Sequence, residues 1–363
     1  MWMLKAFKYR LYPTKQQEAA LNEMLETCRR LYNHSLAERR DAWEKEGRSV
    51  NYYDQANTLK ERRKQDPYLA RVNFSATQDV LRRLDKAFKA FFRRVKAGEK
   101  PGYPRFKGKG RYDSITFPSY GDGCKLKGNR LYVQHVGQIK IKLHREIAGR
   151  IKTVTVRRQA DLWFVTFSCE VESHRLPPTG KAVGVDLGIE SFAITSDGEF
   201  FESARYLRNA ERNLKRLQRQ VSRRKKGSNR RKKAVQQLAR AHMRVACQRR
   251  DTAHKVARSL VNRYDLIAVE DLNIRGMLKN HHLAKSISDA GWNLFVTILK
   301  AKAAEAGRQV VEVDPRNTSQ ICSGCGEIVP KPLSQRWHSC PYCGTSLHRD
   351  VNAAVNILRR AAA

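Results

Sequence analysis

The chain has 363 residues, with 72 Lys and Arg against 35 Asp and Glu, so its formal net charge is +37. So large an excess of positive charge is unusual for an enzyme acting on small molecules and indicates a polyanionic partner such as nucleic acid. Hydrophobic residues make up 41% of the chain, which is enough for packed cores and excludes global disorder. We see no apolar run long enough to span a membrane and no secretory signal in the first ten residues, so we expect no membrane partner and a place in the cytoplasm or on the nucleoid.

Residues 13–96 are predicted to be helical. Thr14 and Gln17 match a capping box, and apolar residues recur at helical spacing over residues 20–32 and 75–91. Three aromatic side chains at helical spacing are interpreted as core residues: Phe88, Phe91 and Phe92.

A different pattern follows a basic, turn-rich loop at residues 100–110. Short stretches alternate apolar and polar residues, which predicts antiparallel strands of a small β-barrel. These stretches are residues 3–11, 114–117, 130–134, 138–143, 151–157 and 162–171. Because residues 3–11 would complete the barrel, the helical region would be an insertion into it. The segment Leu-Pro-Pro-Thr-Gly at residues 176–180 is predicted to be a linker.

A third pattern begins at Lys181. Short strands are predicted at residues 182–186, 192–195, 199–202, 266–270 and 310–313. Helices are predicted at residues 205–262, with a break at 227–228, and at 290–306 and 351–360. This order of a strand, a hairpin, a further strand and a final helix is that of an RNase H-like fold.

Three carboxylates stand at the ends of these predicted elements. Asp186 and Glu270 each end an apolar strand, and Asp350 begins the last helix. In an RNase H-like site such carboxylates hold two Mg²⁺ or Mn²⁺ ions about 3.5–4 Å apart, one generating the attacking hydroxide and one stabilising the leaving 3′ oxygen. Asp271 should face away, because neighbouring strand residues point to opposite faces. The alternative is structural, since a strand-terminal Asp often forms a turn and Asp350 is placed to cap its helix.

A cluster of cysteines has the spacing C-x2-C-x14-C-x2-C. Its members are Cys322, Cys325, Cys340 and Cys343. Two such pairs supply four thiolates for one tetrahedral Zn²⁺, and this ion would be structural because four cysteines leave no open position. His338 is a possible replacement ligand but is interpreted as a surface residue. The other four cysteines are scattered, which does not indicate a disulfide framework.

Seven segments spread over nearly the whole chain carry a family resemblance. They are residues 9–14 (YRLYPT), 103–107 (YPRFK), 185–188 (VDLG), 269–272 (VEDL), 286–292 (SISDAGW), 314–322 (DPRNTSQIC) and 349–358 (RDVNAAVNIL). Together they resemble TnpB, the RNA-guided nucleases of small insertion sequences, which are related to type V CRISPR effectors.

The resemblance implies a multidomain α+β and α/β protein. A wedge-like β-barrel would comprise residues 1–12 and 97–178, and a helical recognition lobe residues 13–96. A RuvC nuclease domain would comprise residues 181–363, with a zinc ribbon at 316–348. The family roles would make Asp186, Glu270 and Asp350 the catalytic metal ligands and the four cysteines the zinc ligands. A transposon-derived guide RNA would direct cleavage of double-stranded DNA next to a short duplex motif, in a complex that we expect to hold one copy of the protein.

Two groups of residues are predicted to contact nucleic acid. Residues 205–250 contain 18 Lys or Arg and one acid, Glu211, so this segment is predicted to bind phosphates of the guide or heteroduplex rather than to be merely a solvated face. Its main candidates are Arg223, Arg224, Lys225, Lys226, Arg230, Arg231, Lys232 and Lys233. Candidates for reading the duplex motif are Tyr52, Tyr53, Ser75, Thr77 and Gln78, although Ser75 and Gln78 also match a second capping box.

Two other functions compete with an active RNA-guided endonuclease. One is a RuvC-type nuclease that recognises branched DNA without RNA. The other is an RNA-guided repressor that binds DNA without cutting it. Loss of a carboxylate would mark the repressor, and all three carboxylates are present.

Overall fold

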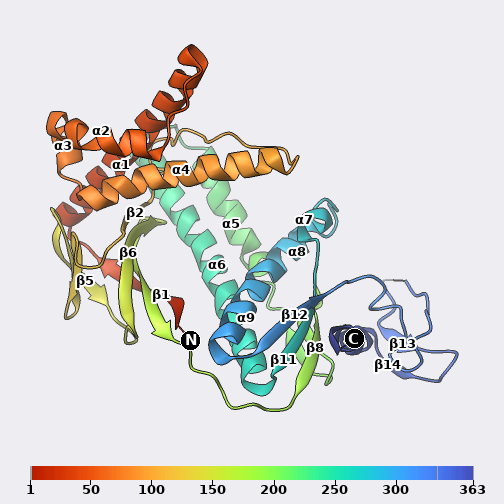
Figure 1. The fold of residues 1–363 in the computed structure, drawn as a ribbon. Helices are drawn as coiled ribbons and strands as arrows, with labels where there is room; N and C mark the ends of the chain where they lie inside the picture. Colours follow the sequence, from red (N-terminus) through yellow and green to blue (C-terminus); the bar gives the residue numbers. More distant parts are fainter. Residues whose placement is uncertain (1, 333, 363) are drawn as a thin grey trace. The chain divides into compact units, whose positions relative to one another are not determined.

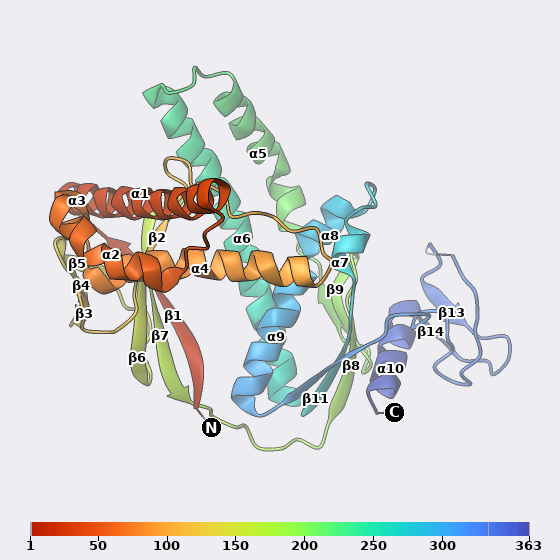
Figure 2. The ribbon, with the colours of Figure 1, turned by 45° about the horizontal axis from the view of Figure 1, so that its top comes forward.

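The computed structural model of the protein describes residues 2–332 and 334–362, and its internal contacts divide the chain into two units, Met1–Glu172 and Ser173–Ala363. Figure 1 and Figure 2 show the elements of each unit. Within the described residues, every helix is too short or too polar to cross a membrane.

The helices of the first unit follow its first strand. They are α1 (Lys15–Glu46), α2 (Tyr52–Gln65), α3 (Pro67–Ala70) and α4 (Phe74–Lys96). Thr14 and Gln17 form the predicted capping box at the start of α1. The second predicted capping box is wrong: Asn73 caps α4 by accepting from the Ala76 N–H, which places Ser75 inside the helix.

The strands of the first unit form one antiparallel, nearly barrel-shaped sheet with the order β2-β6-β7-β1-β5-β4-β3. Its strands are β1 (Trp2–Tyr12), β2 (Ser114–Phe117), β3 (Cys124–Lys127), β4 (Arg130–Val133), β5 (Gly137–Lys142), β6 (Arg150–Gln159) and β7 (Leu162–Glu172). The N-terminal strand β1 lies between β7 and β5, so the four helices are an insertion into the sheet, as predicted.

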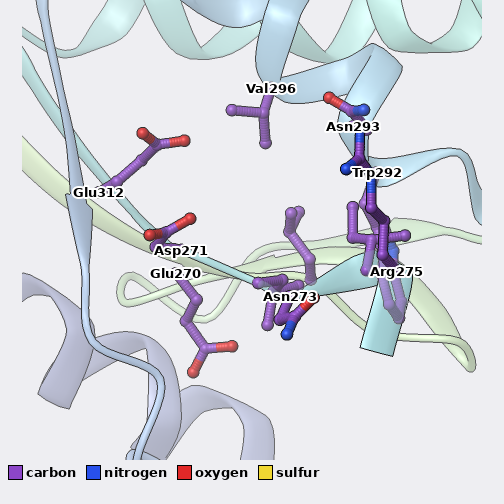
Figure 3. A pocket seen from close by; sticks show the side chains of 11 residues that line it. Glu270, Asp271, Asn273, Arg275, Trp292, Asn293, Val296 and Glu312 are labelled. Atoms are coloured by element: carbon purple, nitrogen blue, oxygen red, sulfur yellow. The ribbon is translucent and has the colours of Figure 1, made fainter. Parts of the chain in front are cut away.

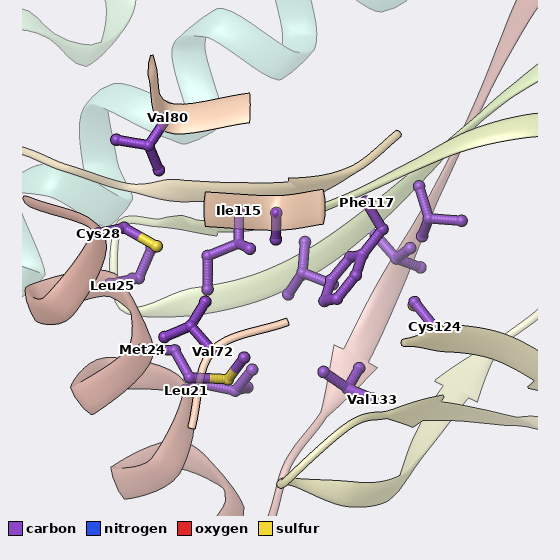
Figure 4. Close-up of a cluster of buried hydrophobic side chains, with 14 of the residues drawn as sticks. Leu21, Met24, Leu25, Cys28, Val72, Val80, Ile115, Phe117, Cys124 and Val133 are labelled. Atoms are coloured by element: carbon purple, nitrogen blue, oxygen red, sulfur yellow. The ribbon is translucent and has the colours of Figure 1, made fainter. Parts of the chain in front are cut away.

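Helices and sheet of the first unit share one hydrophobic core (Figure 4). Leu21 and Leu25 of α1, Val80 of α4, and Ile115 and Phe117 of β2 meet there. The buried residues of α4 end at Leu84.

The last three turns of α4 therefore contain no fully buried side chain. Phe92 is 55% exposed, and Phe88 and Phe91 are half-buried. Phe88 packs against the edge of the core, in line with the prediction. The prediction is wrong for Phe92, and Phe91 is only half-buried, because α4 continues beyond the core that buries its first half.

The second unit contains a five-stranded sheet with the order β10-β9-β8-β11-β12. Its strands are β8 (Ala182–Asp186), β9 (Ser191–Thr195), β10 (Phe200–Glu202), β11 (Leu266–Glu270) and β12 (Gln309–Val313). Strands β8, β11 and β12 are parallel, whereas β9 and β10 run antiparallel. Along the chain, these strands follow the order that the sequence predicts for an RNase H-like fold.

The other elements of this unit are six helices and a short hairpin. The helices are α5 (Tyr206–Ser222), α6 (Asn229–Arg263), α7 (Ile274–Met277), α8 (Ala284–Ala290), α9 (Trp292–Ala306) and α10 (Arg349–Ala362). The hairpin strands are β13 (Trp337–Ser339) and β14 (Ser346–His348). Helices α6 and α9 share a core with one face of the sheet, and α10 packs against the other face.

The segment predicted to be a linker is hydrogen bonded to the second unit. The Leu176 N–H donates to the Ala306 carbonyl, and the Asp265 carboxylate accepts from the Thr179 and Gly180 N–H groups. Arg308, which pairs with Asp265, donates to the Pro177 carbonyl at 2.8 Å. These contacts place residues 176–180 in the second unit rather than free between the two.

Candidate active site and metal centre

The alternation of the strands directs two of the candidate carboxylates to one face of the sheet. Gly184 lies directly under α10, where an added Cβ would collide with the Ala354 carbonyl oxygen. Asp186, two residues on, therefore points to the same face. In the same way Ala268 packs with Ile357 of α10, and Glu270 follows it by two residues.

The third carboxylate reaches this face on the helix itself. Asp350 lies in the first turn of α10. The close approach of α10 to β8, which only a glycine at position 184 permits, brings Asp350 toward Asp186. Three elements that are distant in the sequence thus contribute one carboxylate each.

The three acids influence one another electrostatically. Burial raises the pKa of Asp186 well above its ordinary value, and the negative charges of Glu270 and Asp350 raise it further. Burial also raises the pKa of Glu270, against the opposing hydrogen bond from Thr318. Arg349 and Arg360 offset only part of this effect, lowering the pKa of Asp186 and of Glu270 respectively. Carboxylates gathered in this way are unfavourable, and their hard oxygen donors fit Mg²⁺ or Mn²⁺.

Residues outside the predicted set position these carboxylates. The Thr318 hydroxyl donates to Glu270 Oε1 at 2.6 Å. Asn356 of α10 donates to the Thr318 carbonyl at 2.8 Å, and Asn352 accepts from the Ser323 N–H at 2.8 Å. The helix that carries Asp350 therefore also fixes the segment that holds Glu270. Sequence reasoning gave these residues no role, although they lie within the segments 314–322 and 349–358 that carry the resemblance.

A pocket of about 280 Å³ lies at the end of β11 (Figure 3). In Figure 3 the side chains of Glu270 and Asp271 point in opposite directions, as the strand geometry predicts, and Asp271 lies toward Glu312. Glu312 forms an ion pair with Lys300 at 2.5 Å. Glu270 and Asp271 both line the pocket, so it adjoins the end of β11 that carries the candidate carboxylate.

The four predicted zinc ligands lie together. Among the described residues, the sulfurs of Cys322, Cys325, Cys340 and Cys343 form a group in which every atom lies within 4.8 Å of the others. The sulfurs of Cys322 and Cys343 are 3.6 Å apart, and the Thr345 hydroxyl and N–H groups lower the pKa of the Cys343 thiol to about 6. Four converging thiols, one already acidic, fit a tetrahedral Zn²⁺.

His338 is not a surface residue, as the sequence had suggested, but is fully buried. Its Nδ1 contacts Lys331 Nζ, and burial, followed by the positive charge of Arg349, lowers the pKa of the Lys331 ammonium group. The position of His338 on β13, whose neighbours Trp337 and Ser339 are exposed, explains the burial, because alternate residues of the hairpin face inward.

The predicted phosphate-binding residues lie around the turn between α5 and α6. All are exposed except Arg231, which is half-buried. Arg224 donates to the Arg230 carbonyl at 2.7 Å, which closes the turn. Exposed cations on a two-helix hairpin can contact a phosphate backbone.

The candidates for reading a duplex differ in accessibility. Tyr53 is 73% exposed, and Tyr52, Ser75 and Gln78 are half-buried. Thr77 is fully buried, and its hydroxyl donates to the Phe74 carbonyl at 2.6 Å. The Ser75 hydroxyl donates to Asp122.

Asp289 joins the basic hairpin to the helices next to β11. Its carboxylate accepts from the Leu207 N–H at the start of α5 and pairs with Arg249 of α6 at 2.7 Å. It lies on α8, directly before α9. The contacts of Asp289 therefore give a structural role to residues 286–292, one of the segments that carry the family resemblance.

Family models match three parts of the chain. They are described as "Probable transposase" over residues 166–281, "Cas12f1-like, TNB domain" over residues 292–357 and "Helix-turn-helix domain" over residues 1–48. The last description does not fit the fold, since these residues form strand β1 and the single long helix α1.

Similar proteins cover almost the whole chain. A "Putative RNA-guided DNA endonuclease" of Streptomyces pristinaespiralis is 36% identical over 361 residues, which are 98% of this chain and 88% of the relative. "Putative RNA-guided DNA endonuclease InsQ" of Escherichia coli K12 is 32% identical over 99% of this chain and 92% of its own length. The solved structure of the mini-RNA-guided endonuclease CRISPR-Cas_phi3 superposes on this protein with a TM-score of 0.54 and 10% sequence identity. The match covers 99% of this chain and 92% of that one, and it supports the fold.

Proposed function

Since the chain belongs to the TnpB family of RNA-guided DNA endonucleases from insertion sequences, we propose that Asp186, Glu270 and Asp350 form its RuvC-type catalytic site. The observation that carries the proposal is the convergence of these three acids on the sheet face covered by α10. Asp271, the exposed acid directly after Glu270, points in the opposite direction. The activity is therefore assigned to one specific face of the sheet.

The three carboxylates would hold two divalent cations, which supply a metal-bound nucleophile and stabilise charge on the leaving 3′ oxygen. Thr318 fixes one oxygen of Glu270 and leaves the other for binding. Arg336 lies at the rim, 4.0 Å from Asp350 and bound to Glu190 at 2.8 Å, where a half-exposed guanidinium can attract a DNA phosphate. Asn352 and Asn356 keep α10 in register with the segment that carries Thr318.

The proposed partners are a transposon-derived guide RNA and its double-stranded target DNA, bound by a single copy of the protein. The exposed cations between α5 and α6 would bind phosphates, which gives affinity without sequence reading. Tyr53, with Tyr52, Ser75 and Gln78 beside it, would face the short duplex motif. Thr77 would support the first turn of α4 from within the core.

The four cysteines would bind one structural Zn²⁺. The ion would tie the β13–β14 hairpin to the segment that begins at Cys322. Because Thr318 lies shortly before Cys322 in the chain, zinc would contribute to the position of Glu270 as well as to folding.

The first experiment sequences the RNA that co-purifies with the protein when it is expressed beside its native flanking DNA. One dominant RNA with a constant part and a 3′ end copied from the element boundary is expected. That RNA, reprogrammed to a plasmid, should direct double-strand cleavage in Mg²⁺ and none in EDTA. A heterogeneous mixture of cellular RNAs, or cleavage that survives in Asp186→Ala, would contradict the proposal.

A further inference from the structure

The second half of α4 and the loop after it carry an aromatic patch that extends from Phe88, at the edge of the hydrophobic core, to exposed rings. The aromatic patch consists of Phe88, Phe91, Phe92, Tyr103 and Phe106. Phe92, Tyr103 and Phe106 are 55%, 45% and 48% exposed. Contiguous exposed apolar surface of this kind marks a binding site more often than a passive surface.

Four rings of the patch hold one another in place, and Phe106 follows Tyr103 on the same loop. Phe91 lies 5.2 Å from Phe92 and 5.5 Å from Tyr103 between ring centroids, both in edge-to-face geometry. Phe88 stacks with Phe92 at 6.3 Å and meets the edge of Tyr103 at 5.6 Å. The loop that carries Tyr103 is fixed at Lys107, whose N–H donates to Asn33 and whose carbonyl accepts from Arg29. The patch is therefore a preorganised surface.

Cations outnumber acids around the patch, where Asp85 pairs with Lys89 and Asp41 pairs with Arg40. Residues 86–112 contain ten Lys or Arg and one acid, Glu99. Arg93, Arg94 and Lys96 are exposed, and within the described residues no acidic side chain pairs with them. The guanidinium of Arg40 lies 5.4 Å from the centroid of the Phe106 ring.

This combination identifies the chemistry of the occupant. Exposed rings bind unpaired bases by stacking, while flanking Lys and Arg bind the phosphates between them. A second copy of the chain would bring the same positive charge to the surface and be repelled. The aromatic surface is exposed at all times, so we expect its partner to be bound at all times as well. In the proposed complex that partner is the guide RNA, whereas a displaced DNA strand is present only during targeting.

We propose that the patch is a stacking platform for unpaired bases of the guide RNA. The inference rests on the proposed function only for the existence of that RNA, and it concerns RNA binding rather than cutting. The three exposed rings, Phe92, Tyr103 and Phe106, would contact bases directly. Phe88 and Phe91 would support Phe92 and Tyr103 from beneath.

The test measures the affinity of the full-length protein for an unstructured oligouridine 12-mer by fluorescence anisotropy at several salt concentrations. Phe92→Ala should weaken binding about tenfold or more, because one base–aromatic stack is lost. The slope of log affinity against log salt should stay unchanged, because this slope counts phosphate contacts. Arg93→Gln should instead reduce that slope.

Two further variants separate stacking from other roles of the ring. Phe92→Trp should retain affinity because it keeps a planar face, whereas Phe92→Leu should lose it despite its similar apolar bulk. Tyr68→Ala is the matched control, since Tyr68 is an aromatic residue of the same unit with 51% exposure outside the patch. Its RNA affinity should equal that of the wild type.

Three results would overturn the inference. One is an unchanged affinity of Phe92→Ala for oligouridine. Another is a loss confined to an oligothymidine 12-mer, which would assign the patch to the displaced DNA strand. The third is a lower melting temperature or a changed oligomeric state of Phe92→Ala with unaltered RNA affinity, which would assign the patch to a protein contact. Because the assay requires no cleavage, failure of the catalytic assignment would leave its result unaffected.

Discussion

The second unit contains two clusters of potential metal ligands that are built in different ways. The cysteine cluster is local: its four thiols come from residues 322–343 and converge within 4.8 Å. The carboxylate cluster is assembled from β8, β11 and α10, whose acids lie at positions 186, 270 and 350. A short segment can form the first cluster, whereas the second exists only once the whole sheet and its covering helix are in place.

The two clusters should also differ in what they contribute to stability. A structural Zn²⁺ contributes binding free energy to the folded state. Buried, mutually repelling carboxylates oppose folding, as the raised pKa of Asp186 indicates. With the proposed ions, one cluster would stabilise the unit, whereas the other would reduce its stability in return for a reactive site.

The largest effect is expected from removing a carboxylate of the α10-facing cluster. Glu270→Gln should lower the rate of guided DNA cleavage at least about 1,000-fold, because metal-ion stabilisation of the transition state contributes several kcal/mol. Asp271→Asn, at the next position but facing away, is the matched control and should cleave at the wild-type rate. Single-turnover cleavage of a plasmid target measures the rates of both variants. Equal losses of rate would contradict the assignment of Glu270 to the face covered by α10 and of Asp271 to the opposite face.

Removing a zinc ligand should act on stability first. Cys322→Ser should lower the midpoint of thermal unfolding by more than about 10 °C, because the folded state loses the free energy of zinc binding. Cys247→Ser, which replaces an exposed cysteine outside the cluster, should leave that midpoint unchanged. Metal analysis should find one zinc per chain in the control, and an equally stable, zinc-free Cys322→Ser protein would contradict a structural role.

Separating α10 from the sheet should damage the carboxylate cluster alone. In Gly184→Ala the new methyl group would collide with the Ala354 carbonyl, so the helix carrying Asp350 must move. We expect cleavage to fall about 10- to 100-fold with unchanged zinc content. Normal cleavage would show that the approach of α10 to β8 does not set the active geometry.

The smallest effect is expected at the hydroxyl that supports Glu270. Thr318→Val keeps the shape of the side chain but removes the hydrogen bond to Glu270 Oε1. Loss of such a positioning bond costs about tenfold in activity. Thr318→Ser should restore the rate, because it restores the donor, and a Ser variant as slow as the Val variant would rule out this role.

Much of this arrangement follows from local sequence patterns. Alternation predicted most strands within one or two residues, and the spacing of the four cysteines predicted their convergence. Strand parity also predicted that Glu270 and Asp271 point apart. Each of these patterns depends on residues close to one another in the chain.

The errors arose where distant contacts decide the outcome. Helical periodicity made Phe92 resemble a core residue, but α4 extends beyond the elements that could cover it. A Ser-x-x-Gln pattern suggested a helix start at Ser75, yet Asn73 is held at that point by Asp122 and Gln134. The short strand β3 and the helices α7 and α8 were not predicted, since short elements depend on their neighbours for stability.

The most direct test of the difference between the clusters is a titration of the zinc-loaded protein with Mn²⁺, followed by electron paramagnetic resonance. The wild-type protein should bind two Mn²⁺ ions, and Asp186→Asn should lose this binding while keeping its zinc and a melting temperature at least as high as that of the wild type. Undiminished Mn²⁺ binding in Asp186→Asn would contradict the assignment of Asp186, Glu270 and Asp350 as the catalytic metal site.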